Sequence, residues 1–143
     1  DVDDAVWDAS NDVMCHAFEL GAETGCPVQL HTEGGEDFTE IAEWAEDRGL
    51  PREQVVKHYS GGYVDGPIPS VIGNKEALED ATDHGGPFLM ETDFLDDPDR
   101  PGAVLGPKTV PKRVRWLLEE GYEEAVYTAH VDTPARVYGI ETN

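Results

Sequence analysis

The sequence predicts an α/β protein built from parallel βα units. Short apolar runs alternate with longer segments of helical periodicity, and glycines separate the two kinds of segment. Parallel strands are covered on both faces, so each reads as a brief apolar run. The 143 residues suffice for one domain, which we expect to span 1–143, but fall short of the roughly 250 residues of a complete (β/α)8 barrel.

Four strands are expected where short apolar runs are bounded by glycine, proline or polar residues. They are 26–30, 54–60, 69–72 and 87–90. Each run is too brief for a helix of ordinary length, and turn-forming residues follow it. We therefore expect four buried strands.

The first helix is expected over 5–22, because Val6, Val13, Ala17 and Leu20 recur at helical spacing and should form its buried face. Further helices are expected at 38–49, from Asn74 through Ala81, from Val110 through Leu118, and at 123–138.

Two of these helices carry specific signals. Asn74 stands in an N-cap position, with Ala77, Leu78 and Ala81 on the buried side of the helix that follows. Pro134 should break or offset the last helix, since proline has no N–H to donate within it.

Acidic residues dominate the charge. The chain has 31 Asp and Glu against 10 Lys and Arg, a net charge of −21, with four lysines. This composition excludes an ordinary basic nucleic-acid binder, but not a phosphate-containing substrate bound through metal. Acidity spread over the chain is expected of a halophilic, archaeal source; an acidic mesophilic protein is the alternative.

The cysteines and the hydropathy pattern bear on location. Cys15 and Cys26 form no C-x-x-C pair and are expected to be small buried hydrophobes in a reducing compartment. The sequence contains no apolar run long enough for a membrane span and no basic-then-apolar leader. A cytoplasmic protein without membrane partners is expected.

Three strand ends carry residues that can bind metal or move protons: His31, His58 and Asp93. The carboxyl ends of parallel strands face one edge, so these side chains should converge there. His31 and His58 would be metal ligands, and Asp93 a further ligand or the catalytic base for an attacking water. Alternatively, each histidine is an ordinary hydrogen-bonded residue. The other histidines, His16, His84 and His130, have no partner at ligand spacing.

These strand ends resemble the last half of the TatD-type metal-dependent hydrolases, a family of amidohydrolase-like barrels. The resemblance lies in Val28-Gln-Leu-His31, His58-Tyr59-Ser60-Gly61 and Met90-Glu91-Thr92-Asp93, in that order. The closing stretch 135–140 is similar to the terminal helix of the family, and the insert 96–108 to its substrate-contacting loop.

The resemblance implies an eight-stranded (β/α)8 barrel of the TIM type, of which this chain would supply strands five to eight. It implies phosphodiester hydrolysis, typically 3′ to 5′ trimming of DNA, with one or two divalent ions such as Zn, Mg or Mn. His31 and His58 would share one metal, while Asp93 binds the other and orients the water. Glu91, taken to lie on the opposite phase of its strand, would be structural support; Lys57 and Tyr59 would face the helix layer.

The family also uses a His-x-His pair on the first strand and a Glu on the fourth, and nothing before His31 supplies them. The chain therefore resembles half of a barrel. The missing N-terminal half, or a second copy of the chain, would complete it. A small ester, lactone or amide is the alternative substrate, and a non-catalytic fragment is the alternative to an enzyme.

Overall fold

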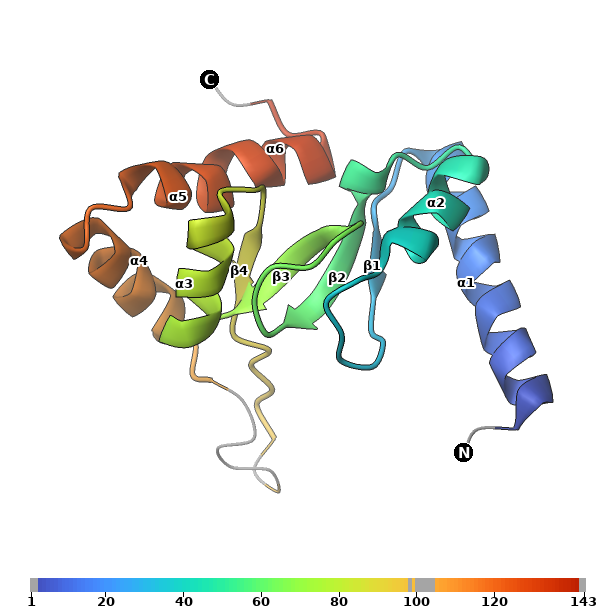
Figure 1. Cartoon of the computed structure of the whole chain (residues 1–143), viewed down its shortest axis with the longest axis horizontal. Helices are drawn as coiled ribbons and strands as arrows, with labels where there is room; N and C mark the ends of the chain where they lie inside the picture. Colours follow the sequence, from blue (N-terminus) through green and yellow to red (C-terminus); the bar gives the residue numbers. More distant parts are fainter. Residues whose placement is uncertain (1–2, 98, 100–104, 142–143) are drawn as a thin grey trace.

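The computed structural model describes residues 3–97, 99 and 105–141, and these residues fold around one parallel sheet (Figure 1). Its strands are β1 (Val28–Leu30), β2 (Val55–Ser60), β3 (Ile68–Ile72) and β4 (Leu89–Glu91). Their order in space equals their order in the chain. A barrel wall has this consecutive order, whereas a doubly wound sheet reverses direction at a switch point. The predicted α/β class is confirmed, and the sheet is compatible with half of a barrel.

The strand register divides the side chains between two faces of the sheet. Gln29 pairs with Val56 and Ile72 with Glu91, whereas Val28 pairs with Val55 and Val71 with Met90. Val55 and Val71 belong to clusters formed with the helices. Because alternate side chains point to opposite faces, Gln29, Val56 and Glu91 lie on the other face of the sheet, where Val56 packs with Val137 of the last helix.

Helices connect and cover the strands, and Figure 1 shows α1 and α2 toward the β1 end of the sheet and α3, α4 and α5 toward the β4 end, with α4 outside α3. They are α1 (Asp4–Thr24), α2 (Thr39–Asp47), α3 (Lys75–His84), α4 (Thr109–Glu119), α5 (Glu123–Tyr127) and α6 (Thr133–Tyr138). A 3₁₀ turn, Arg52–Gln54, leads into β2. No helix among the described residues is long and apolar enough to cross a membrane.

The predicted start of α3 is confirmed. The Asn74 side chain accepts a hydrogen bond from the Ala77 N–H at 2.7 Å, and Ala77, Leu78 and Ala81 are buried. An N-cap side chain satisfies an amide that has no carbonyl partner within the helix.

Pro134 offsets the last helix without breaking it. A π-helical segment, Thr128–Asp132, joins α5 to α6, and Pro134 lies in the first turn of α6. Proline lacks an N–H, and its ring collides with the carbonyl four residues earlier in a regular α-helix. The wider π turn accommodates both defects.

Two clusters fill the space between sheet and helices. One joins α1, α2, β1 and β2 through Phe18, Ala45, Leu30 and Val55. The other joins β3, α3 and the π-helical segment and is centred on Val71, Leu78, Phe88 and Ala129. A third, smaller cluster on the other face joins Val56, Ile68 and Leu89 to Val137 of α6, so the strands are fixed from both sides.

The buried face predicted for α1 is wrong. Val6, Val13 and Leu20 are 59%, 71% and 52% exposed, whereas Phe18 and Gly21 are the buried residues of this helix. A Cβ on Gly21 would lie 2.9 Å from the Cys26 carbonyl oxygen, so only glycine allows this close approach. The helix has two apolar stripes, and its own period does not reveal which one packs against the rest of this chain.

The insert predicted at 96–108 lies partly outside the described residues, which exclude 98 and 100–104. Leu105 of this insert donates its N–H to the Thr92 carbonyl and packs against the cluster around Leu78. The segment after Leu105 is therefore tied to the end of β4.

Candidate metal centre

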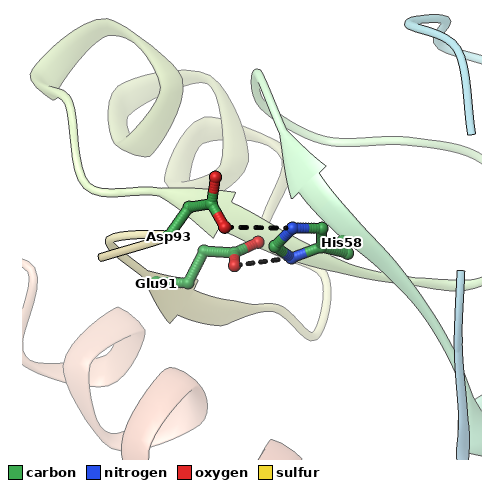
Figure 2. Close-up of side chains that lie close together, drawn as sticks. All are labelled: His58, Glu91 and Asp93. Atoms are coloured by element: carbon green, nitrogen blue, oxygen red, sulfur yellow. Dashed lines mark ion pairs between the residues drawn. The ribbon is translucent and has the colours of Figure 1, made fainter. Parts of the chain in front are cut away.

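His58, Glu91 and Asp93 form one group at the carboxyl ends of β2 and β4 (Figure 2). Each offers a ligand atom, and these atoms lie within 4.8 Å of one another. His58 comes from β2, Glu91 ends β4, and Asp93 follows two residues later. The sheet thus brings together residues that are more than thirty positions apart in the sequence.

Each nitrogen of the His58 ring faces a different carboxylate. Nδ1 is 2.7 Å from Glu91 Oε2, and Nε2 is 3.3 Å from Asp93 Oδ1. The side chains of His58 and Glu91 are 17% and 15% exposed, whereas that of Asp93 is 40% exposed. The inner pair is shielded from water, and the Asp93 side opens to solvent.

A bulge in β2 orients the imidazole. Lys57 pairs with Pro69 and Ser60 with Val71, so His58 and Tyr59 together stand opposite the single residue Ser70. Tyr59 has a φ of 54°, and Asp93 has a φ of 48°. Bulges commonly redirect a side chain beside a functional site, and left-handed backbone is uncommon outside glycine. Both flanks of the site therefore carry backbone strain.

The sequence predicts that Glu91 lies on the face of its strand opposite to the site. This prediction is wrong. Glu91, the last residue of β4, and Asp93, which follows the strand, both bring a carboxylate oxygen to His58. Glu91 also accepts a hydrogen bond at Oε1 from the Tyr59 N–H. Its expected role as support is compatible with these contacts.

His31 lies next to the group. The residue is exposed, and its ring centroid is 5.3 Å from that of His58, with the planes tilted by 37°. Among the described residues, the cluster with converging ligand atoms does not include His31. That His31 and His58 share a metal, with Asp93 on another, stays a prediction.

Lys57 and Tyr59, which flank His58, behave differently. Lys57 is 4% exposed, lies over the Phe38 ring at 5.6 Å, and donates from Nζ to the His58 carbonyl at 2.6 Å. Burial lowers the pKa of Lys57, and the charge of Glu91 opposes that shift. Lys57 thus faces the helix layer as expected, but Tyr59 does not, since it is 47% exposed with its ring 6.1 Å from that of His58.

The remaining histidines lie elsewhere. His16 approaches Glu19 at 3.4 Å on α1, and His84 stacks on Tyr63 with centroids 3.7 Å apart. His130 belongs to the π-helical segment, where burial lowers its pKa. Within the described part of the chain, none of the three joins the group at the strand ends.

The donor set of the group suits a divalent cation. Imidazole nitrogen and carboxylate oxygen are common ligands of zinc and related ions. Two ligand atoms about 2.0 to 2.1 Å from a tetrahedral ion are about 3.4 Å apart. The 3.3 Å between His58 Nε2 and Asp93 Oδ1 is close to that separation. His58 and Asp93 would hold such an ion, with Glu91 behind the histidine.

The sheet is parallel and in chain order, and histidine and carboxylate side chains meet at its carboxyl edge. The chain is thus an α/β protein with a candidate metal site. The family profile described as "TatD related DNase" matches residues 1–139. This chain therefore belongs to the TatD-related DNase family.

One curated relative matches nearly the whole of this chain. An uncharacterized protein of Methanocaldococcus jannaschii is 40% identical over 149 aligned residues, covering 98% of this chain and 53% of that protein. The chain thus spans about half the length of the curated relative it matches. No solved structure matches the chain.

The sequence pattern missed two contacts of the site. The pattern places Glu91 on the wrong face of its strand, and it does not indicate Gln29, whose Nε2 is 3.3 Å from His58 Nδ1. The period of two along β1 and β4 could have placed both residues on the face of His31 and Asp93. The bulge at Tyr59 had no comparable signal.

The strain at Tyr59 leads to a stability prediction. Valine at this position should lower the free energy of unfolding by about 1 to 2 kcal/mol, because a β-branched residue resists left-handed backbone. Tyr59→Gly should be better tolerated than Tyr59→Val, since glycine adopts this conformation freely. Urea denaturation of both variants measures the difference. Equal stability of the two variants would show that position 59 is not left-handed.

Proposed function

We propose that this protein is the metal-binding half of a hydrolase that cleaves phosphodiesters by attack of a water molecule, as in a DNase. The observation that carries the proposal is the His58–Asp93 pair, 3.3 Å apart at the carboxyl edge of the sheet. Membership of the TatD-related DNase family supports it.

The residues of the site have separate tasks in this proposal. A bound divalent ion supplies Lewis acidity and lowers the pKa of water. In place of the two-metal arrangement that the family resemblance implies, His58 and Asp93 would bind one ion together, with His31 beside them as a further ligand. Asp93, the most exposed of the three clustered side chains, also accepts the proton of the attacking water. Glu91 keeps the His58 ring in place.

The substrate proposal takes the charge into account. A net charge of −21 repels a DNA strand in dilute buffer, and salt that screens this repulsion also weakens contacts to phosphate. A cation at the carboxyl edge would offset the repulsion locally. A small ester, lactone or amide substrate is the alternative within the same chemistry. Cys15 is half-buried and Cys26 is exposed, so the expectation that both are buried is wrong, but their free thiols suit the proposed cytoplasmic location.

Metal content and hydrolysis together test the proposal. We expect the wild-type protein, completed by the rest of its parent, to bind zinc or manganese and to cleave a phosphodiester reporter. His58→Ala should lower the affinity for the metal at least tenfold. Asp93→Asn should abolish turnover, because the acceptor of the water proton is lost. Elemental analysis, calorimetry and product assays measure these effects.

His84→Ala is the matched control, because this histidine stacks on Tyr63 away from the site. It should leave metal content and rate unchanged. Retention of metal and activity by both His58→Ala and Asp93→Asn would show that the site is elsewhere. Cleavage of a carboxylic ester but not of a phosphodiester would favour the alternative substrate, and metal binding without turnover would favour a non-catalytic fragment.

We propose further that the chain forms strands five to eight of a barrel and that the remaining half covers the exposed stripe of α1. Val6, Trp7, Val13 and Leu20 are 52% to 71% exposed along one helix. Apolar surface gathered in this way usually marks an interface. The matched relative is about twice as long as this chain. The remaining half of the parent protein is therefore the proposed occupant of this apolar surface.

The same surface is continuous with the site. A groove of about 950 Å³ is lined by Trp7 and Val13 of α1, Ile41 and Trp44 of α2, and His31 at the end of β1. A segment that fills this groove would therefore reach the metal centre. A second copy of the chain is the less favoured occupant, because two chains of charge −21 repel each other.

Val13→Glu tests this interface, because it places a charge in the middle of the exposed stripe. We expect it to weaken association with the rest of the parent protein, expressed separately, by at least tenfold in a calorimetric titration. Val13→Ile, which keeps the side chain apolar and uncharged, is the control. Equal association of the two variants, or association only between copies of this chain, would contradict the proposed occupant.

We also propose that the protein is built for high salt. Acidic side chains such as Glu40, Glu43 and Asp47 are exposed on α2, and their mutual repulsion is screened over a few ångströms in molar salt. The proposed source is therefore a halophilic archaeon.

Thermal unfolding across a potassium chloride series tests the salt adaptation. The melting temperature should rise from dilute buffer to molar salt. A variant carrying Glu40→Gln, Glu43→Gln and Asp47→Asn should be more stable in dilute buffer and less responsive to salt. A melting temperature that does not rise with salt would contradict this origin.

A further inference from the structure

We propose that Glu91 is a positioning residue that holds the proton of the neutral His58 imidazole on Nδ1 and so presents Nε2 as the metal ligand. This inference rests on the proposed function for the identity of the ligand atom. The state of the imidazole itself can be measured without any metal.

Both oxygens of Glu91 have a partner. Oε2 lies 2.7 Å from His58 Nδ1, and Oε1 accepts from the Tyr59 N–H. The carboxylate is only 15% exposed, so these contacts replace its water shell. A carboxylate with both oxygens occupied in this way is a poor candidate for direct coordination, although its oxygen lies near the other ligand atoms.

The short contact decides where the imidazole proton resides. An unprotonated Nδ1 would place its lone pair 2.7 Å from a carboxylate oxygen, which is repulsive. With the proton on Nδ1, the same contact is a charge-assisted hydrogen bond. In the neutral ring the lone pair is then on Nε2, which faces Asp93 Oδ1 at 3.3 Å. Two acceptors that face each other repel unless a proton or a metal ion lies between them, and a metal ion at this position would use the Nε2 lone pair.

Gln29 offers a weaker, competing contact. Its Nε2 is 3.3 Å from His58 Nδ1, which would be a hydrogen bond only if Nδ1 carried no proton. The Glu91 contact is shorter and involves a charged oxygen, whereas Gln29 is exposed and neutral. Glu91 therefore outweighs Gln29 in setting the tautomer.

The backbone makes the role of Glu91 specific. The Tyr59 N–H can only donate, and it belongs to the bulge that orients His58. A glutamine at position 91 has one oxygen and one NH₂ group, so its oxygen must accept from Tyr59. The NH₂ group then faces Nδ1, which must accept. Glu91→Gln should thus move the proton to Nε2, with little change of shape.

Long-range ¹H–¹⁵N NMR of the metal-free protein at pH 8 reads the tautomer of His58 directly. The His58 signal is assigned among the five histidines from a His58→Gln spectrum. We expect the proton on Nδ1 in the wild type and on Nε2 in Glu91→Gln. Gln29→Ala is the matched control and should keep the proton on Nδ1. By calorimetry, Glu91→Gln should weaken zinc binding about 10-fold to 100-fold.

A proton on Nε2 in the wild type would overturn the inference, even if Glu91→Gln failed to fold. A proton that stays on Nδ1 in Glu91→Gln, or a reversed tautomer with unchanged zinc affinity, would also overturn it. Tautomer reversal in a protein whose wild type binds no zinc would contradict the proposed function while supporting Glu91 as the group that sets the tautomer.

Discussion

The contact between Glu91 and His58 is the interaction on which the candidate site depends. It joins β2 to β4 at the end of the sheet, and the same carboxylate binds the amide of the bulge at Tyr59. The Glu91 side chain thereby accepts from the N–H of the strained residue Tyr59 and fixes the His58 ring that faces Asp93. Without that link, the strands would still form a sheet, but the imidazole would be held only by the bulge and by its longer contacts to Gln29 and Asp93.

The fold explains why these groups can meet. Parallel strands in chain order bring their carboxyl ends to one edge, and two apolar clusters hold the strands from the helix side. The opposite face packs against Val137 of α6 through Val56, Ile68 and Leu89, and it also carries the polar side chains of Gln29 and Glu91. The exposed stripe of α1 is the other consequence of this arrangement, because the chain buries only one of the two apolar faces of that helix.

Much of this architecture was predictable from local patterns. The strands, the cap at Asn74 and the offset at Pro134 follow from short-range physical rules, and His58 and Asp93 follow from the convergence of parallel strand ends. Three features depend on long-range geometry and were not predictable. The bulge at Tyr59 has no glycine to signal it, the buried stripe of α1 is selected by its neighbours, and Glu91 is recognised as a partner of His58 only across the sheet.

The central claim is that His58 and Asp93 bind a cation while Glu91 only supports the histidine. Anomalous X-ray scattering from crystals grown with zinc, measured at both sides of the zinc absorption edge, tests it most directly. The account predicts a peak bonded to His58 Nε2 and to Asp93, with Glu91 still on Nδ1. A peak bonded to Glu91 with the ring of His58 reversed, or no peak at this edge of the sheet, would contradict it.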